Sequence, residues 1–181
     1  MITNQELQET FAGERIRILA PEIVPEGVTS PAARSILTEV GLPPGILNFI
    51  LIDARIVADL PTLSAVFSRY GKSAPRHLAD LYQIAQFGAG SASIDGSTGE
   101  VFLAVLDRPN LAPPLISSSL ENFVKFLNEI ERKRQLVEEG EEAERHTGAL
   151  TRRLTEIDPG VMGELSPWHT VIEIAMDEAR W

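Results

Sequence analysis

The run of residues from 81 to 130 constrains the fold of this chain more than any other part of the sequence. Strand-forming side chains gather in residues 81–87, 91–95 and 100–106, and glycine-rich turns separate these three runs. The turn formers between Gly96 and Gly99 can join the last two runs as an antiparallel hairpin. A serine-rich helix start follows, so this part of the chain predicts an antiparallel sheet that leads into a helix.

Helix signals flank these strands on both sides. Ser30 followed by Pro31 predicts a helix start, and Gly41 is placed to end that helix. Ser118 and Glu121 have the spacing of a capping box. Apolar residues recur at helical offsets in three further segments: Leu63, Val66, Phe67 and Tyr70; Leu120, Phe123, Val124, Leu127 and Ile130; and Trp168, Val171, Ile172 and Ala175.

This order of elements predicts the fold class. Strands in the middle and helices toward the ends favour an α+β protein, with a central antiparallel sheet and helices packed at one face and at the ends. Residues 46–52 are apolar enough for an interior strand, and residues 115–116 for a short edge strand. The charged run over 129–145 predicts an exposed helix weakened at Gly140.

The first 28 residues add a helix and a strand. Thr3 and Glu6 form a capping-box pattern for a helix over residues 4–12, and Gly13 is placed to end it. Residues 15–19 alternate between polar and apolar side chains, as a half-buried strand does. We expect residues 1–28 to belong to the same domain as residues 29–181, and the alternative is a separate flap.

The charge balance limits the class of partner. The chain has 26 acidic and 16 basic residues and a net charge of −10, which makes binding to nucleic acid unfavourable. An acidic protein instead attracts basic partners, although acidity also serves solubility alone. The N-terminus lacks a signal-peptide pattern, and no apolar run is long enough to cross a membrane. We therefore expect a cytoplasmic protein that has no membrane contact.

Motifs for catalysis, metal or cofactor binding are weak. Gly88 and Gly90 precede a strand rather than a helix, so they favour a bend between strands over a phosphate loop. Asp95 starts a run that fails the calcium-loop pattern at its later positions and is better explained as a hairpin turn. The chain has no cysteine, and its histidines are far apart in sequence: His77, His146 and His169. We predict no catalytic residue, no metal site and no cofactor.

Several motifs together resemble a known family. They are a helix that ends in Val40-Gly41-Leu42-Pro43; strand and turn pieces at 86–88, 93–95 and 98–101; the serine-rich helix start at 116–120; and a closing segment at 158–159 and 168–173. In order and spacing this pattern resembles the SUKH superfamily of immunity proteins, closest to its fourth, actinobacterial-type subgroup. Ser117 departs from the pattern, because an asparagine is common at that place.

The resemblance implies a non-enzymatic α+β protein that binds and neutralises a polymorphic-type toxin. The partner would be the cognate toxin, for example a basic nuclease or deaminase domain. Acidic residues on the hairpin turn and in the charged run are then candidate contacts: Asp95, Glu100, Glu138, Glu139, Glu141 and Glu142. Two alternatives stay open. One is a regulatory protein-interaction module of the same fold, and the other is a small-molecule-binding or catalytic domain that uses a cleft beside residues 88–99.

Overall fold

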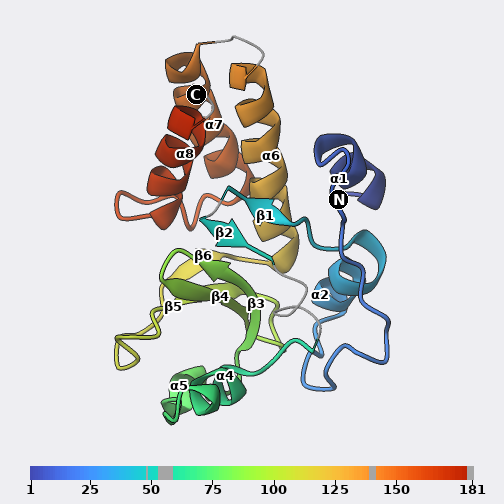
Figure 1. Ribbon diagram of the computed structural model, residues 1–181, viewed down its shortest axis with the longest axis vertical. Coiled ribbons are helices and arrows are strands. Elements are labelled where there is room, and N and C mark those ends of the chain that lie inside the picture. The colour runs from blue at the N-terminus through green and yellow to red at the C-terminus, as the bar shows by residue number, and fades with distance from the viewer. Residues whose placement is uncertain (48, 53–58, 139–141, 179–181) are drawn as a thin grey trace.

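A computed structural model describes residues 1–47, 49–52, 59–138 and 142–178 (Figure 1). Its strands form one antiparallel sheet in which sequence order is also spatial order. The strands are β1 (Gly45–Ile46), β2 (Ile50–Leu51), β3 (Tyr82–Phe87), β4 (Gly90–Ile94), β5 (Val101–Ala104) and β6 (Leu115–Ser117). The three central strands confirm the predicted strand runs, and β6 confirms the predicted edge strand.

Helices cover this sheet unevenly. The long helices α6 (Leu120–Glu138), α7 (Ala143–Ile157) and α8 (Pro167–Glu178) pack together on one side, whereas α4 (Leu63–Arg69) and α5 (Arg76–Ala79) lie on the other (Figure 1). The N-terminal part contributes α1 (Asn4–Thr10), α2 (Pro31–Ser35) and a π-helical turn η1 (Ile36–Val40). The predicted α+β class, with a central antiparallel sheet, is confirmed.

The two faces of the sheet pack against different apolar clusters. Successive strand residues point to opposite faces. Val101 of β5 therefore belongs to the main core with the long helices, whereas Phe102 and Ala104 face α4 and α5. Ser91 and Ser93 of β4 stand opposite Ala104 and Phe102, and their buried hydroxyls share a hydrogen bond of 2.9 Å. The polar groups on this second face are thus satisfied by each other.

Trp168 joins three elements of the main core. Its fully buried ring makes edge contacts with Phe87 of β3 and Phe126 of α6, at centroid distances of 5.4 and 4.9 Å. The indole N–H donates a hydrogen bond of 2.7 Å to the carbonyl of Ile116 in β6. Trp168 therefore holds α8 against the sheet and α6, as its place in a predicted apolar stripe suggested.

Two predicted caps are confirmed at atomic detail. The Thr3 hydroxyl accepts from the Glu6 N–H, and the Glu6 carboxylate accepts from the Thr3 N–H at 2.8 Å. Ser30 caps α2 through Ala33, with Pro31 in the first turn. N-terminal residues also enter the main core, since Leu7 is fully buried there and the Gln135 side chain of α6 donates to the Thr10 carbonyl at 2.7 Å.

Two strand predictions are wrong. Residues 15–19 form only one bridge, between Arg17 and Leu42, because the chain turns away at residues 21–23 before a ladder can extend. The apolar run 46–52 is a hairpin rather than one strand, since β1 and β2 pair with each other. Position 48, within that run, lies outside the described residues.

The predicted start of α6 is also wrong by one residue. Ser119, not Ser118, caps the helix by accepting from the Asn122 N–H at 3.1 Å. Glu121 does not close a capping box, because its carboxylate accepts from the Ile2 N–H and pairs with Lys125. The Ser118 N–H instead donates to the Asp158 carboxylate at 2.6 Å. Asp158, 40 residues away, thus accepts from the Ser118 N–H in place of Glu121.

The charged run does not form one exposed helix. It is divided between the end of α6 and the start of α7, where Glu142 has extended backbone at the N-cap. Within this run Glu131 is buried and receives two hydrogen bonds from Arg134. Gly140, the predicted weak point, lies outside the described residues.

Candidate protein-binding surface

The face of the sheet that is turned away from the long helices holds a small satellite cluster. It consists of Leu63, Val66, Phe67, Leu78, Leu81 and Ala104. Thr62 begins α4 by accepting from the Ala65 N–H, which directs the apolar stripe of α4 onto β5. The cluster is separate from the main core, so α4 and α5 form a layer of their own on this face.

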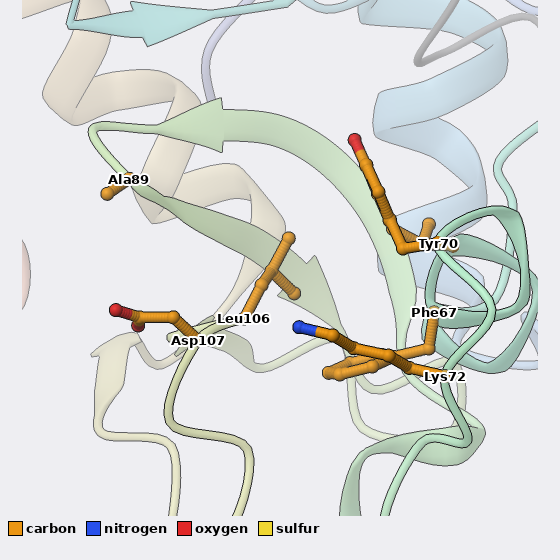
Figure 2. A pocket seen from close by; sticks show the side chains of 7 residues that line it. Phe67, Tyr70, Lys72, Ala89, Leu106 and Asp107 are labelled. Atoms are coloured by element: carbon orange, nitrogen blue, oxygen red, sulfur yellow. The ribbon is translucent and has the colours of Figure 1, made fainter.

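An apolar hollow opens beside this layer, between α4, the β3–β4 turn and the end of β5 (Figure 2). Its volume is ≈ 230 Å³, and Val66, Phe67, Leu106 and Ala89 provide its apolar lining. Pockets for drug-sized ligands enclose about 300 Å³ or more. The hollow is therefore small for an organic cofactor and of a size to accept one side chain.

Two opposite charges flank the hollow. In Figure 2 the Lys72 side chain extends across the hollow from the α4 side, and Asp107 lies at the opposite rim, on the same side as Ala89. Within the part of the chain that the structure describes, neither charged group forms an ion pair or a hydrogen bond. Both charges are thus available to a partner.

Tyr70 stands at the edge of the same hollow and is 72% exposed. It was predicted to continue the apolar stripe of its helix, but it is the C-cap of α4, with φ −100° and ψ 12°. The helix has ended there, so the ring points to solvent rather than into the cluster. Exposed tyrosines are typical of protein interfaces, because the ring offers large contact area at low entropy cost.

A second, more open hollow lies on the other side of the satellite cluster. Its volume is ≈ 460 Å³, and its lining includes His77, Phe102, Asn110 and the candidate residue Asp95. Leu111, in the adjoining β5–β6 loop, is 57% exposed. This face therefore combines two hollows with the exposed side chains of Tyr70 and Leu111. The hollows beside α6 have mainly polar linings, which include Arg132 and Gln135.

Asp95 has a structural role in the β4–β5 turn. Its carboxylate accepts hydrogen bonds from the N–H groups of Ser97 and Thr98 and from the Ser97 hydroxyl at 2.6 Å. The Ser97 hydroxyl bond is the main cause that lowers the pKa of Asp95. The sequence-based explanation of Asp95 as a turn residue is thus confirmed. Glu100 closes the same turn by accepting from the Thr98 hydroxyl at 3.1 Å.

The candidate residues of the charged run lie elsewhere. Glu138, at the end of α6, pairs with Arg134, which also pairs with Glu131. Glu142 is exposed and makes no side-chain cap. Glu139 and Glu141 lie outside the described residues. Figure 1 shows the end of α6 at the far tip of the helical layer, well separated from the β4–β5 turn. The six candidates therefore belong to two regions rather than one patch.

The net charge is distributed unevenly along the chain. Residues 60–114, which include α4, α5 and the three central strands, contain four basic and four acidic side chains. The whole net charge of −10 therefore comes from residues 1–59 and 115–181. A basic partner would be attracted by the helical parts, whereas the two hollows lie on an electrically balanced face.

Groups that could act as a metal or catalytic centre are dispersed. Among the described residues no three His, Asp or Glu side chains gather as metal ligands. The His169 ring nitrogen Nε2 lies 3.1 Å from the Gly163 carbonyl, a local loop contact. Asp158 is buried, but its carboxylate accepts hydrogen bonds from the Ser118 backbone N–H and the Ser117 hydroxyl, which is a structural role. No helix in the described ranges is long and apolar enough to cross a membrane.

These features define an α+β protein whose surface offers a hollow of side-chain size and unpaired charges, as a protein-binding domain does. A comparison with protein families then identifies the family of this chain. The model of the SUKH-4 immunity protein family matches residues 2–174, and the chain belongs to this family. The resemblance seen in the sequence is thereby confirmed, and the match includes the first helix. Comparisons with curated proteins and with solved structures found no match.

Family membership makes this chain an immunity protein, whose partner is a toxin. The sequence indicated a cleft beside residues 88–99, and Ala89 of that run lines the hollow beside Tyr70, but the contribution of α4 was not predicted. A signal on the α4 side was Gly71, which directly follows Tyr70 and has φ +66°. A glycine in that conformation ends the helix at residue 70 and turns the tyrosine outward.

Proposed function

We propose that this protein is a non-catalytic immunity protein that neutralises its cognate toxin domain by forming a stoichiometric complex with it. Membership of the SUKH-4 family supports the proposal most directly. We further propose that the toxin is a basic nuclease or deaminase domain and that the complex forms in the cytoplasm, where such an enzyme meets its nucleic acid.

Charge supports the choice of a basic partner. The net charge of −10 resides outside residues 60–114, so the helical parts of the molecule present the negative field. Enzymes that act on nucleic acid carry basic surfaces, and opposite fields accelerate encounter. The exposed carboxylate of Glu142 is a candidate contact, together with Glu139 and Glu141. Glu138 is a weaker candidate because it already pairs with Arg134.

The first experiment tests neutralisation itself. The tagged chain is used to capture partners from its native lysate, and a captured toxin fragment is then expressed alone and together with the chain. We expect the fragment to stop growth alone, growth to return on co-expression, and light scattering to show a one-to-one complex. A captured host protein that is not toxic would instead favour the regulatory module.

The second experiment locates the acidic contact. Reversal of Glu138, Glu139, Glu141 and Glu142 to lysine should slow association at low salt by about tenfold or more, because steering is lost. The control reverses four exposed acidic residues that change the net charge equally: Glu9, Glu14, Glu22 and Glu26. If both variants slow association equally, net charge acts without a local contact. An unchanged rate in the first variant removes the charged run from the interface.

A further inference from the structure

We propose that the hollow beside Tyr70 is the anchor pocket of the toxin complex and receives one apolar side chain of the toxin, of leucine to phenylalanine size. This inference rests on the proposed function and adds the residue class that the partner must present. On the toxin, a carboxylate next to that side chain would form an ion pair with Lys72. A basic group next to it would form an ion pair with Asp107.

The size of the hollow selects a side chain as its occupant. A cavity of about 150 Å³ with apolar walls is large enough for benzene. The present hollow of ≈ 230 Å³ therefore accommodates a phenyl ring and lies below the range of pockets for drug-sized ligands. Its walls are apolar, because Val66, Phe67 and Leu106 face it. An apolar side chain would be stabilised by its removal from water in this hollow, whereas a polar one would lose its hydrogen bonds to water.

The surroundings of the hollow match a binding hot spot. Such sites centre on a well-packed pocket with tyrosine, tryptophan or arginine beside it, ringed by polar groups. Tyr70 supplies the exposed ring, and Lys72 and Asp107 supply charges on opposite rims that have no partner within the described residues. Because the two charges have opposite sign, they also favour one orientation of the incoming segment over its reverse.

The test fills the hollow from its own wall. Ala89 lies exposed in the β3–β4 turn and lines the hollow, so Ala89→Trp should occupy it without disturbing the core. Ala12→Trp, at an exposed alanine after α1, is the matched control. Circular dichroism and the thermal midpoint establish that both variants are folded. We expect toxin Kd to rise about tenfold or more in Ala89→Trp and to stay unchanged in Ala12→Trp.

A peptide probe separates this inference from the proposed function. The peptide acetyl-Gly-Glu-Phe-Arg-Gly-amide is titrated into the full chain while methyl NMR signals of Val66, Ala89 and Leu106 are followed. We expect saturable shifts at these methyl groups, no shifts with glycine in place of phenylalanine, and no shifts at Val66 and Leu106 in Ala89→Trp. Shifts that persist in Ala89→Trp, or that lie elsewhere, would overturn the anchor pocket.

The toxin measurement completes the separation. If the wild-type chain binds toxin and Ala89→Trp binds it equally well, the anchor is wrong while the immunity function stands. If the peptide binds in the hollow but no toxin is bound or neutralised, the immunity function fails and the toxin as occupant fails with it. Lys72→Glu provides a second variant, which should weaken binding of both peptide and toxin without filling the hollow.

Discussion

The carboxylate of Asp158 accepts a hydrogen bond of 2.6 Å from the backbone N–H of Ser118, although the two residues are 40 positions apart. The same carboxylate oxygen accepts from the Ser117 hydroxyl at 3.1 Å. Asp158 follows α7, and Ser118 lies between β6 and α6. This contact therefore fastens the end of the helical layer to the corner where the sheet meets it.

Removal of this carboxylate should destabilise the fold. Asp158→Ala leaves the buried Ser117 hydroxyl and the Ser118 N–H without this acceptor, and we expect the free energy of unfolding to fall by about 2–4 kcal/mol. Urea denaturation measures the change. Ser118→Ala is the matched control, because it keeps the backbone N–H and removes only an exposed hydroxyl that accepts from the Asn122 side chain. Equal stability of Asp158→Ala and the wild type would show that the contact is dispensable.

The turn at Asp95 makes part of the stability dependent on pH. Its pKa is lowered in the folded state, chiefly by the Ser97 hydroxyl. The contribution is thus fully present above the ordinary aspartate pKa of 3.8 and is lost as the pH falls through the lower folded value. Asp95→Asn should be less stable than the wild type at pH 7, and the difference should shrink below about pH 4. A difference that stays constant down to pH 3 would contradict this assignment.

Gly148 offers a stabilising substitution. It lies in the interior of α7, is exposed, and a Cβ added there would meet no atom within 4 Å. Because glycine has the larger backbone entropy in the unfolded chain, Gly148→Ala should raise the free energy of unfolding by about 0.5–1 kcal/mol. A shift of the urea midpoint to higher concentration measures the gain. An unchanged or lower midpoint would contradict the prediction that glycine at position 148 destabilises α7.

Gly45 shows the opposite case. It has φ +115°, and an added Cβ would lie 2.0 Å from the Ile50 carbonyl oxygen across the β1–β2 pair. Gly71 also has positive φ, +66°, but open space around it. Gly71→Ala should therefore cost about 1–2 kcal/mol for the left-handed backbone alone, whereas Gly45→Ala should cost clearly more. Thermal unfolding of both variants compares them, and similar losses would show that the clash is relieved without cost.

Local sequence signals predicted the elements whose determinants are themselves local. The Thr3–Glu6 capping box, the Ser30 cap and the Asp95 turn each depend on residues within three positions, and each is present as predicted. The capping box at the start of α6 was wrongly predicted because Asp158, 40 residues away, accepts from the Ser118 N–H in place of Glu121. No pattern of neighbouring residues contains that information.

The candidate surface was harder to predict for the same reason. Acidic residues are visible in a sequence, but Arg134 neutralises Glu138 only because both lie on one face of a helix that also buries Glu131. The hollow at Tyr70 depends on the β3–β4 turn and the end of β5 meeting α4 in space. Its lining residues are spread over 42 positions from Val66 to Asp107, so no single motif marks it.

The satellite cluster has an evolutionary consequence. The side chains that hold α4 and α5 in place are distinct from those of the main core. Substitutions at the rim of this layer, at Tyr70, Lys72 or Asp107, can therefore change recognition without disturbing Trp168 and its neighbours. A lineage of such proteins could keep one scaffold while its binding layer diverges, and new toxin specificities would then arise at little risk to folding.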